Sequence, residues 1–185
     1  AADTVGERLR SFRREALREG IPESLIDTAL RDLTIDSSVL RNSRNQPEFT
    51  LKYPEYRGYF VTDEMVRRGV RVLGRHRDLL RDLEERYGVP AEVLVALWGV
   101  ESRYGHHESK HDVLRSIYTM AFGRADRSEY FEGELLAVLR ILHRNLIPRD
   151  RLKGSWAGAM GQPQFMPSSF LTYAVDYDGD GRTNL

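Results

Sequence analysis

Helical periodicity runs through almost the whole chain, and no segment carries a strong strand pattern. Residues 34–60 break the periodicity, and we expect a long loop or extended connection there. Elsewhere apolar residues recur three and four positions apart, which predicts helices over 4–19, from Pro22 onwards, and over 62–87, 90–105, 112–123, 127–145 and 167–175. Thr62 is expected to cap its helix and Gly88 to end it. The predicted fold class is all-α (mainly α).

The charge pattern limits the classes of partner that can be expected. Lys+Arg and Asp+Glu both number 28, so the chain has no basic field that would indicate nucleic acid. Arginine is dense in residues 67–86, but acidic residues alternate with it, which is typical of a solvated helix face. The absence of cysteine excludes a disulfide scaffold and cysteine–zinc sites. No apolar run reaches the roughly 18–20 residues of a transmembrane segment, although a lipid anchor stays open.

A glutamate in an apolar helix is the first candidate for chemistry. Four residues fall at i, i+3, i+4 and i+7, which is one helix face: Leu94, Leu97, Trp98 and Glu101. If that face is buried, Glu101 loses water, and its pKa rises towards neutrality, where it can deliver a proton. The alternative is that Glu101 points into solvent or pairs with Arg103.

Residues 154–170 form a glycine-rich segment with features of a ligand groove. Small residues let backbone approach a ligand, and aromatic and thioether side chains offer flat apolar surface. Polar side chains could hydrogen-bond sugar hydroxyls. The candidates are Trp156, Phe165 and Met166 for the apolar surface, and Ser155 and Gln164 for the hydrogen bonds. The alternative is a tightly packed turn whose aromatic residues complete the core, and we favour the groove.

The C-terminal residues 176–185 match the opening of an EF-hand loop. Aspartates stand at loop positions 1, 3 and 5, with glycine at position 6 and a backbone carbonyl available at position 7: Asp176, Asp178, Asp180 and Arg182. The chain ends before position 12, where the bidentate carboxylate belongs. We therefore expect a structural calcium site with an incomplete loop, against the alternative of a plain acidic turn.

His107, Glu108 and His111 fit the H-E-x-x-H zinc-peptidase pattern. That pattern works on a helix with one buried side, whereas here it follows Tyr104 and Gly105, which indicate a helix end, and its neighbours are polar. A zinc peptidase is therefore kept only as the weaker alternative.

Three blocks taken together resemble the membrane-bound lytic murein transglycosylase B family. They are GVPAEVLVALWGVESRYG (88–105), GSWAGAMGQPQFMPSSF (154–170) and DYDGDGRTNL (176–185). The resemblance implies a lysozyme-like helical core over 61–185, preceded by an N-terminal helical part with a connecting loop over 1–60. It also implies that the chain is a C-terminally shortened member, because the family continues past the calcium loop.

The resemblance further implies cleavage of the β-1,4 bond between N-acetylmuramic acid (MurNAc) and N-acetylglucosamine (GlcNAc) in peptidoglycan, with formation of a 1,6-anhydroMurNAc end. Glu101 would be the single catalytic acid/base, and the chemistry would need no cofactor. Ser155, Gln164, Phe165 and Met166 match substrate-binding positions, and the three C-terminal aspartates match the calcium loop.

The expected partners are peptidoglycan glycan strands, bound by a monomer exported to the periplasm or cell envelope of a bacterium. A different class of function stays open beside the enzyme: a non-catalytic module that binds peptidoglycan or calcium. Such a module would bind glycan saturably and release no product.

Overall fold

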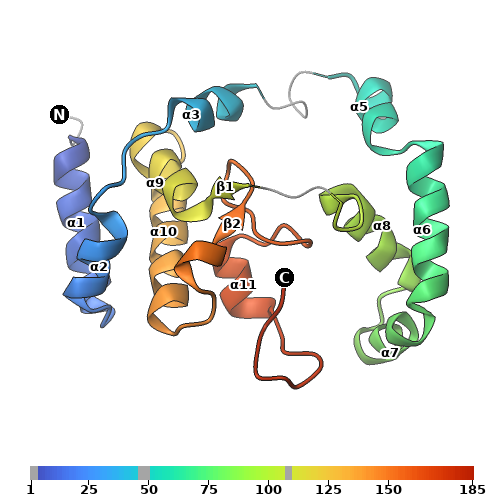
Figure 1. The fold of residues 1–185 in the computed structure, drawn as a ribbon. Coiled ribbons are helices and arrows are strands. Elements are labelled where there is room, and N and C mark those ends of the chain that lie inside the picture. Colours follow the sequence, from blue (N-terminus) through green and yellow to red (C-terminus); the bar gives the residue numbers. More distant parts are fainter. Residues whose placement is uncertain (1–3, 46–50, 107–109) are drawn as a thin grey trace. The chain divides into compact units, whose positions relative to one another are not determined.

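The computed structural model describes residues 4–45, 51–106 and 110–185. This part of the chain is mainly helical (Figure 1), which confirms the predicted fold class. In chain order, the elements are α1 (Val5–Arg18), α2 (Glu23–Leu30), α3 (Ser37–Arg44), α5 (Tyr53–Phe60), α6 (Asp63–Arg75), α7 (Arg77–Tyr87), α8 (Ala91–Ser102), β1 (His111–Asp112), α9 (Val113–Gly123), α10 (Ser128–His143), the 3₁₀ helix η1 (Arg149–Arg151), β2 (Lys153–Gly154) and α11 (Pro167–Tyr173).

Two compact units form from this chain, the first from the described parts of 1–44, 109–161 and 165–185. At its centre α10 packs against α9, with α1, α2 and α11 against α10 and α3 against α9 (Figure 1). The helices meet through fully buried side chains, among them Leu114, Ile117, Met120, Leu135, Leu139 and Ile141. The glycine-rich segment and α11 extend from this core, which therefore positions both of them.

Polar contacts set the ends of these helices and join segments distant in sequence. The Thr4 hydroxyl accepts a hydrogen bond from the Glu7 backbone N–H, and the Glu7 carboxylate accepts one from the Thr4 N–H, which is a capping box at the start of α1. Arg8 of α1 pairs with Glu132 of α10 and donates a hydrogen bond of 2.6 Å to the carbonyl of Ala121 on α9. These contacts hold α1 against the central helix pair.

The second unit contains α5 to α8 and residues 162–164. Its buried apolar core consists, among the described residues, of Val72, Leu80 and Val95. Tyr104 packs between α6 and α8, where its hydroxyl donates a hydrogen bond of 3.1 Å to the Met65 carbonyl.

The prediction of a loop over 34–60 is wrong, because this region contains α3 and α5. Each has eight residues, so it makes about two turns and offers little periodicity to detect. α3 buries Val39 and Ser43, four residues apart, and only one of the two is apolar. Apolar periodicity therefore missed a helix that uses a serine on its buried face.

The single helix predicted over 62–87 is divided in two at His76, whose backbone (φ −109°, ψ 24°) is not helical. The ends of the segment agree with the prediction. The Thr62 hydroxyl accepts a hydrogen bond of 3.2 Å from the Met65 N–H, and Gly88 ends α7 in the left-handed conformation with φ 69°. Gly74 lies two residues before the break but remains inside α6, and His76 itself has no strong turn propensity, so the sequence did not predict the break.

A two-stranded antiparallel ladder joins β1 to β2, with His111 opposite Gly154 and Asp112 opposite Lys153. Strands of two residues carry no alternation, so sequence patterning could not predict them. The Asp112 carboxylate then accepts a hydrogen bond of 3.0 Å from the Arg115 N–H and caps α9. The ladder thus fixes the start of the glycine-rich segment beside the start of α9.

Candidate active site

Glu101 is the penultimate residue of α8. The buried residues of this helix are Val95, Gly99 and Ser102, whereas Leu97 is 56% exposed and Glu101 is exposed. The prediction that Leu94, Leu97, Trp98 and Glu101 form the buried face is therefore wrong, although Leu94 and Trp98 are half-buried. Apolar residues of α8 occur on almost every side of the helix, so their spacing could not show which side packs against α6.

The predicted rise in the pKa of Glu101 is nevertheless present. Partial burial raises the pKa of its carboxyl above the ordinary value, although the side chain stays open to solvent on one side. No ion pair joins Glu101 to Arg103 in the part of the chain that the structure describes. The carboxyl is thus suited to hold and release a proton.

Trp98 lies one helical turn before Glu101 and is fixed by contacts on both sides. Its ring meets those of His76 and Tyr104 edge to face, with centroid distances of 5.7 and 6.0 Å. Its indole N–H donates a hydrogen bond of 2.7 Å to Oε1 of Gln162. Sequence reasoning did not single out Gln162, because nothing local in the chain marks a partner 64 positions from the tryptophan.

The glycine-rich segment forms a tight hairpin in which Met160 and Phe165 exchange two backbone hydrogen bonds, of 2.8 and 3.0 Å. The Ser155 hydroxyl accepts a hydrogen bond of 3.0 Å from the Ala159 N–H, so this side chain stabilises the turn. Gln164 is half-buried, with a positive φ of 53° at the hairpin tip.

Phe165 and Met166 are half-buried and pack against the core of the first unit, as does Trp156. Each therefore buries one side in the core and keeps another side open. Both interpretations of these side chains, core packing and ligand surface, are compatible with this arrangement.

Packing explains two of the glycines that the sequence suggested for close approach to a ligand. A Cβ at Gly154 would collide with the backbone carbonyl oxygen of Ala159 and would lie 2.8 Å from Cγ2 of Val113 on α9. One at Gly158 would lie 2.7 Å from Cδ1 of Ile117, also on α9. Gly154 therefore lets the hairpin close on itself as well as lie against α9, and Gly158, at a φ of 92°, lets it lie against that helix.

The structure brings Asp176, Asp178 and Asp180 together, with one carboxylate oxygen from each within 4.8 Å of the others. The Asp176 carboxylate accepts hydrogen bonds of 2.8 Å from the backbone N–H groups of Gly179 and Gly181. These bonds lower the pKa of Asp176, and the bond from Gly181 has the larger effect. Arg182 donates its backbone N–H to Asp180, at 2.8 Å, and its carbonyl belongs to the same turn. This all-oxygen donor set fits Ca²⁺.

The described residues do not support the zinc-peptidase pattern. His107 and Glu108 lie outside the described residues, and His111 belongs to strand β1. The pattern needs both histidines one turn apart on a helix, which a strand cannot provide.

The fold and these motifs together define the class of protein to which the chain belongs. Residues 4–185 match the family described as the transglycosylase SLT domain, and the chain belongs to this family.

Individual relatives agree with that assignment. The chain is 41% identical over 157 residues to the membrane-bound lytic murein transglycosylase B of Escherichia coli, an alignment that covers 80% of this chain and 44% of the relative. Among solved structures it is similar to SltB3 from Pseudomonas aeruginosa in complex with NAG-NAM-pentapeptide, with 38% identity, a TM-score of 0.85, and coverage of 99% and 49% of the two chains.

It is also similar to the Escherichia coli lytic transglycosylase Slt35 in complex with calcium, with 36% identity and a TM-score of 0.83 over 96% of this chain and 57% of that one. The chain thus spans about half the length of the relatives that it matches.

Proposed function

We propose that this chain cleaves the MurNAc–GlcNAc β-1,4 bond of peptidoglycan as a lytic transglycosylase, with Glu101 as its single acid/base. The observation that carries the proposal is a carboxyl of raised pKa at the end of α8, in a chain that belongs to the transglycosylase SLT domain family. A relative bound to NAG-NAM-pentapeptide supports the choice of substrate. Ser155, Gln164, Phe165 and Met166 are proposed to bind the glycan.

The mechanism follows from one carboxyl acting twice. Protonated Glu101 donates its proton to the glycosidic oxygen, and the bond from that oxygen to C1 of the muramoyl residue breaks. The resulting carboxylate then accepts the proton of the muramoyl C6 hydroxyl, whose oxygen bonds to C1. Glu101 ends protonated, no water is consumed, and the product carries a 1,6-anhydro ring. A glycosidase that uses water needs a second carboxyl group, which this route does not.

The test is mass spectrometry of peptidoglycan digested by the wild-type chain and by its Glu101→Gln variant. Fragments lighter by one water than hydrolysis products should appear with the wild type and disappear with the variant. Glu92→Gln is the matched control, since Glu92 is an exposed glutamate at the other end of α8. Products that carry the added water would show a hydrolase, and saturable glycan binding without product would show a binding module.

Calcium is proposed as a structural ion held by Asp176, Asp178 and Asp180, with the carbonyl of Arg182 as a further ligand. The gathered carboxylates support this, as does a relative in complex with calcium. Bound calcium, with two positive charges, would offset the repulsion among the three close carboxylates and hold the turn. We expect Asp178→Asn to weaken binding about tenfold, because it removes one anionic ligand. Isothermal titration with Ca²⁺ measures this directly, and equal affinity in both proteins would contradict it.

The location proposed for the enzyme is the periplasm or cell envelope of a bacterium, where it would act as a monomer on glycan strands. A relative named as membrane-bound supports the envelope. In the described ranges no helix has the length and apolar character to span a bilayer. We further propose that residues 61–185 carry the catalytic core, with 1–60 as an N-terminal helical part.

A further inference from the structure

Gln162 is the residue of the glycine-rich segment that contacts the helix carrying Glu101. Residues 162–164 belong to the second unit, whereas residues 154–161 and 165–170 on either side of them belong to the first. Within the second unit, Oε1 of Gln162 accepts the hydrogen bond of 2.7 Å from the indole N–H of Trp98. An indole has one N–H donor, so this bond satisfies it. Because Trp98 lies about one helical turn before Glu101, the bond fixes a ring next to the proposed acid.

The same side chain also lies against the residue that follows the end of α8. A Cβ at Gly105 would lie 2.6 Å from Oε1 and 3.3 Å from Nε2 of Gln162. The amide group of Gln162 therefore occupies the space where a side chain at position 105 would begin. Trp98 and Gly105 stand on opposite sides of Glu101 in the chain. One glutamine side chain thus contacts the segment 98–105 at both of its ends, with the proposed acid between them.

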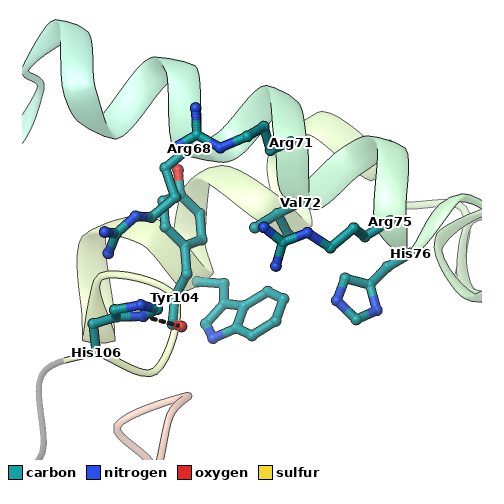
Figure 2. A pocket seen from close by; sticks show the side chains of 8 residues that line it. Arg68, Arg71, Val72, Arg75, His76, Tyr104 and His106 are labelled. Carbon is teal, nitrogen blue, oxygen red and sulfur yellow. Dashed lines mark hydrogen bonds between the residues drawn. The ribbon is translucent and has the colours of Figure 1, made fainter.

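The turn that ends this segment has an uncommon backbone conformation. Arg103 and Tyr104 have φ of 50° and 60°, in the left-handed region that residues other than glycine rarely adopt, and Gly105 continues with φ 75°. Such a conformation persists only where the surrounding contacts enforce it. Figure 2 shows the ring of Tyr104 extending from the turn towards α6, where its hydroxyl donates the hydrogen bond of 3.1 Å to Met65. The Tyr104 carbonyl accepts one of 3.2 Å from Nδ1 of His106. The contact with the glutamine amide adds to this set at the last residue of the turn.

The tip of the hairpin also carries a proposed glycan-binding residue. Gln164 follows Gln162 by two positions, has φ 53°, and belongs to the second unit, as Glu101 does. The other three proposed glycan-binding residues belong to the first unit. Because the hydrogen bond between Gln162 and Trp98 joins the tip to α8, it constrains the position of Gln164 relative to Glu101 inside one unit.

From these contacts, and resting on the proposed function, we propose that Gln162 is a positioning residue of the transglycosylase reaction. It acts through Trp98 and the turn after α8, which it holds so that Glu101 and Gln164 keep a fixed mutual position. The side-chain carbonyl is the group that matters, because it accepts the indole N–H. A side chain of similar length without that oxygen should therefore fail, and one that keeps the oxygen should succeed.

Two variants separate the acceptor from the size of the side chain, and a spectroscopic test needs no cleavage. Gln162→Met keeps an unbranched chain and removes the carbonyl oxygen, whereas Gln162→Glu keeps an oxygen acceptor. In the ¹⁵N-labelled chain, the indole N–H signal of Trp98 should move upfield in Gln162→Met and stay near its wild-type position in Gln162→Glu. The signal of Trp156, the other tryptophan, should stay unchanged in both. Amides of residues 103–105 should exchange about fivefold faster in Gln162→Met, as expected when one hydrogen bond is lost.

A kinetic test separates positioning from stability. On peptidoglycan, Gln162→Met should lower kcat about tenfold or more and change KM less, because the acid is misplaced while other glycan contacts remain. Gln162→Glu should recover most of the lost kcat. Gly88→Ala is the matched control, since it removes the left-handed glycine that ends α7 and strains the same unit at the other end of α8. It should lower the melting temperature and leave kcat and the Trp98 signal as in the wild type.

Three results would overturn the proposal. They are an unchanged Trp98 signal with unchanged exchange of 103–105 in Gln162→Met, a loss of kcat in Gln162→Glu equal to that in Gln162→Met, and a loss as large in Gly88→Ala. Cleavage by the wild type with the same kcat in Gln162→Met would contradict this inference alone. If the wild type cleaves no peptidoglycan, the proposed function fails, and the Trp98 signal and the exchange rates still decide whether Gln162 holds the segment.

Discussion

The proton of Glu101 connects the proposed chemistry to the stability of the fold. Burial raises the pKa of this carboxyl above its ordinary value of 4.5, so the folded chain keeps the proton to a higher pH than the unfolded chain does. Below the ordinary value the group is protonated in both states and does not alter the free energy of unfolding. As the pH rises through and above that value, the unfolded state ionises first, and this group makes the fold progressively less stable.

We predict that Glu101→Gln removes this pH dependence, because glutamine carries no titrating proton. The melting temperatures of variant and wild type should agree at pH about 3.5, and the variant should melt higher at pH about 8. The gain should be small, since the side chain is open to solvent. Thermal unfolding followed by circular dichroism at the two pH values measures it.

Glu92→Gln provides the comparison for that experiment. Glu92 lies in the first turn of α8, where the helix dipole favours a negative charge, so its loss should give no gain at high pH. An equal rise in melting temperature for both variants would show that the effect comes from losing any glutamate charge on α8 and not from the position of Glu101.

At the scale of elements, the packing of α6 against α8 depends on two glycines that face Tyr104. A Cβ at Gly69 would lie 2.7 Å from the Tyr104 hydroxyl oxygen, and one at Gly99 would lie 2.6 Å from it. That hydroxyl is held by its hydrogen bond to Met65, so it has little freedom to move away. The glycines are therefore required by the close approach of the two helices.

We predict opposite effects for two glycine-to-alanine substitutions on α6. Gly69→Ala should destabilise the fold by about 1–3 kcal/mol, because the added methyl group overpacks the contact with Tyr104. Gly74→Ala should stabilise it by up to about 1 kcal/mol, since its Cβ would meet nothing within 4 Å and alanine favours the helix. Free energies of unfolding from urea titration distinguish them, and a shift of the same sign in both would refute the packing argument.

The same elements show how far sequence reasoning reached. Thr62 and Gly88 marked helix ends correctly, because capping and left-handed ends depend on the residue at one position. The buried face of α8 was mispredicted, because apolar residues lie all round that helix and the surface packed against it decides which of them are buried. The alternating charges of α6 predicted a solvated helix face. The sequence could not show that some of these arginines line a pocket with Trp98 and His76, because Trp98 is distant from them in the chain.

For the whole molecule, the order of the chain conceals which segments fold together. The described parts of residues 1–44, 109–161 and 165–185 form one unit, although most of the second unit lies between the first two of these segments in sequence. The Arg8–Glu132 pair makes such a contact across 124 positions. Periodicity and capping are local signals, so they predicted the helices of this unit other than α3, and they could not predict that its two ends meet.

The unequal cores of the two units predict unequal local stability. In the described residues, the second unit buries Val72, Leu80 and Val95, whereas the core of the first unit is much larger. Because opening free energy follows buried apolar contact, amides of α7 should exchange with deuterium at least about tenfold faster than those of α10.

Two substitutions separate local opening from global unfolding in that exchange experiment. Leu80→Ala removes contacts worth about 2 kcal/mol or more and should speed exchange in α6 to α8 while leaving α10 protected. Leu139→Ala, in the core of the first unit, should speed exchange in α9 and α10. If Leu80→Ala accelerated exchange in α10 as strongly as in α7, the units would open together, and the difference in their cores would not determine their stability. Mass spectrometry of exchanged peptides from each helix measures both cases.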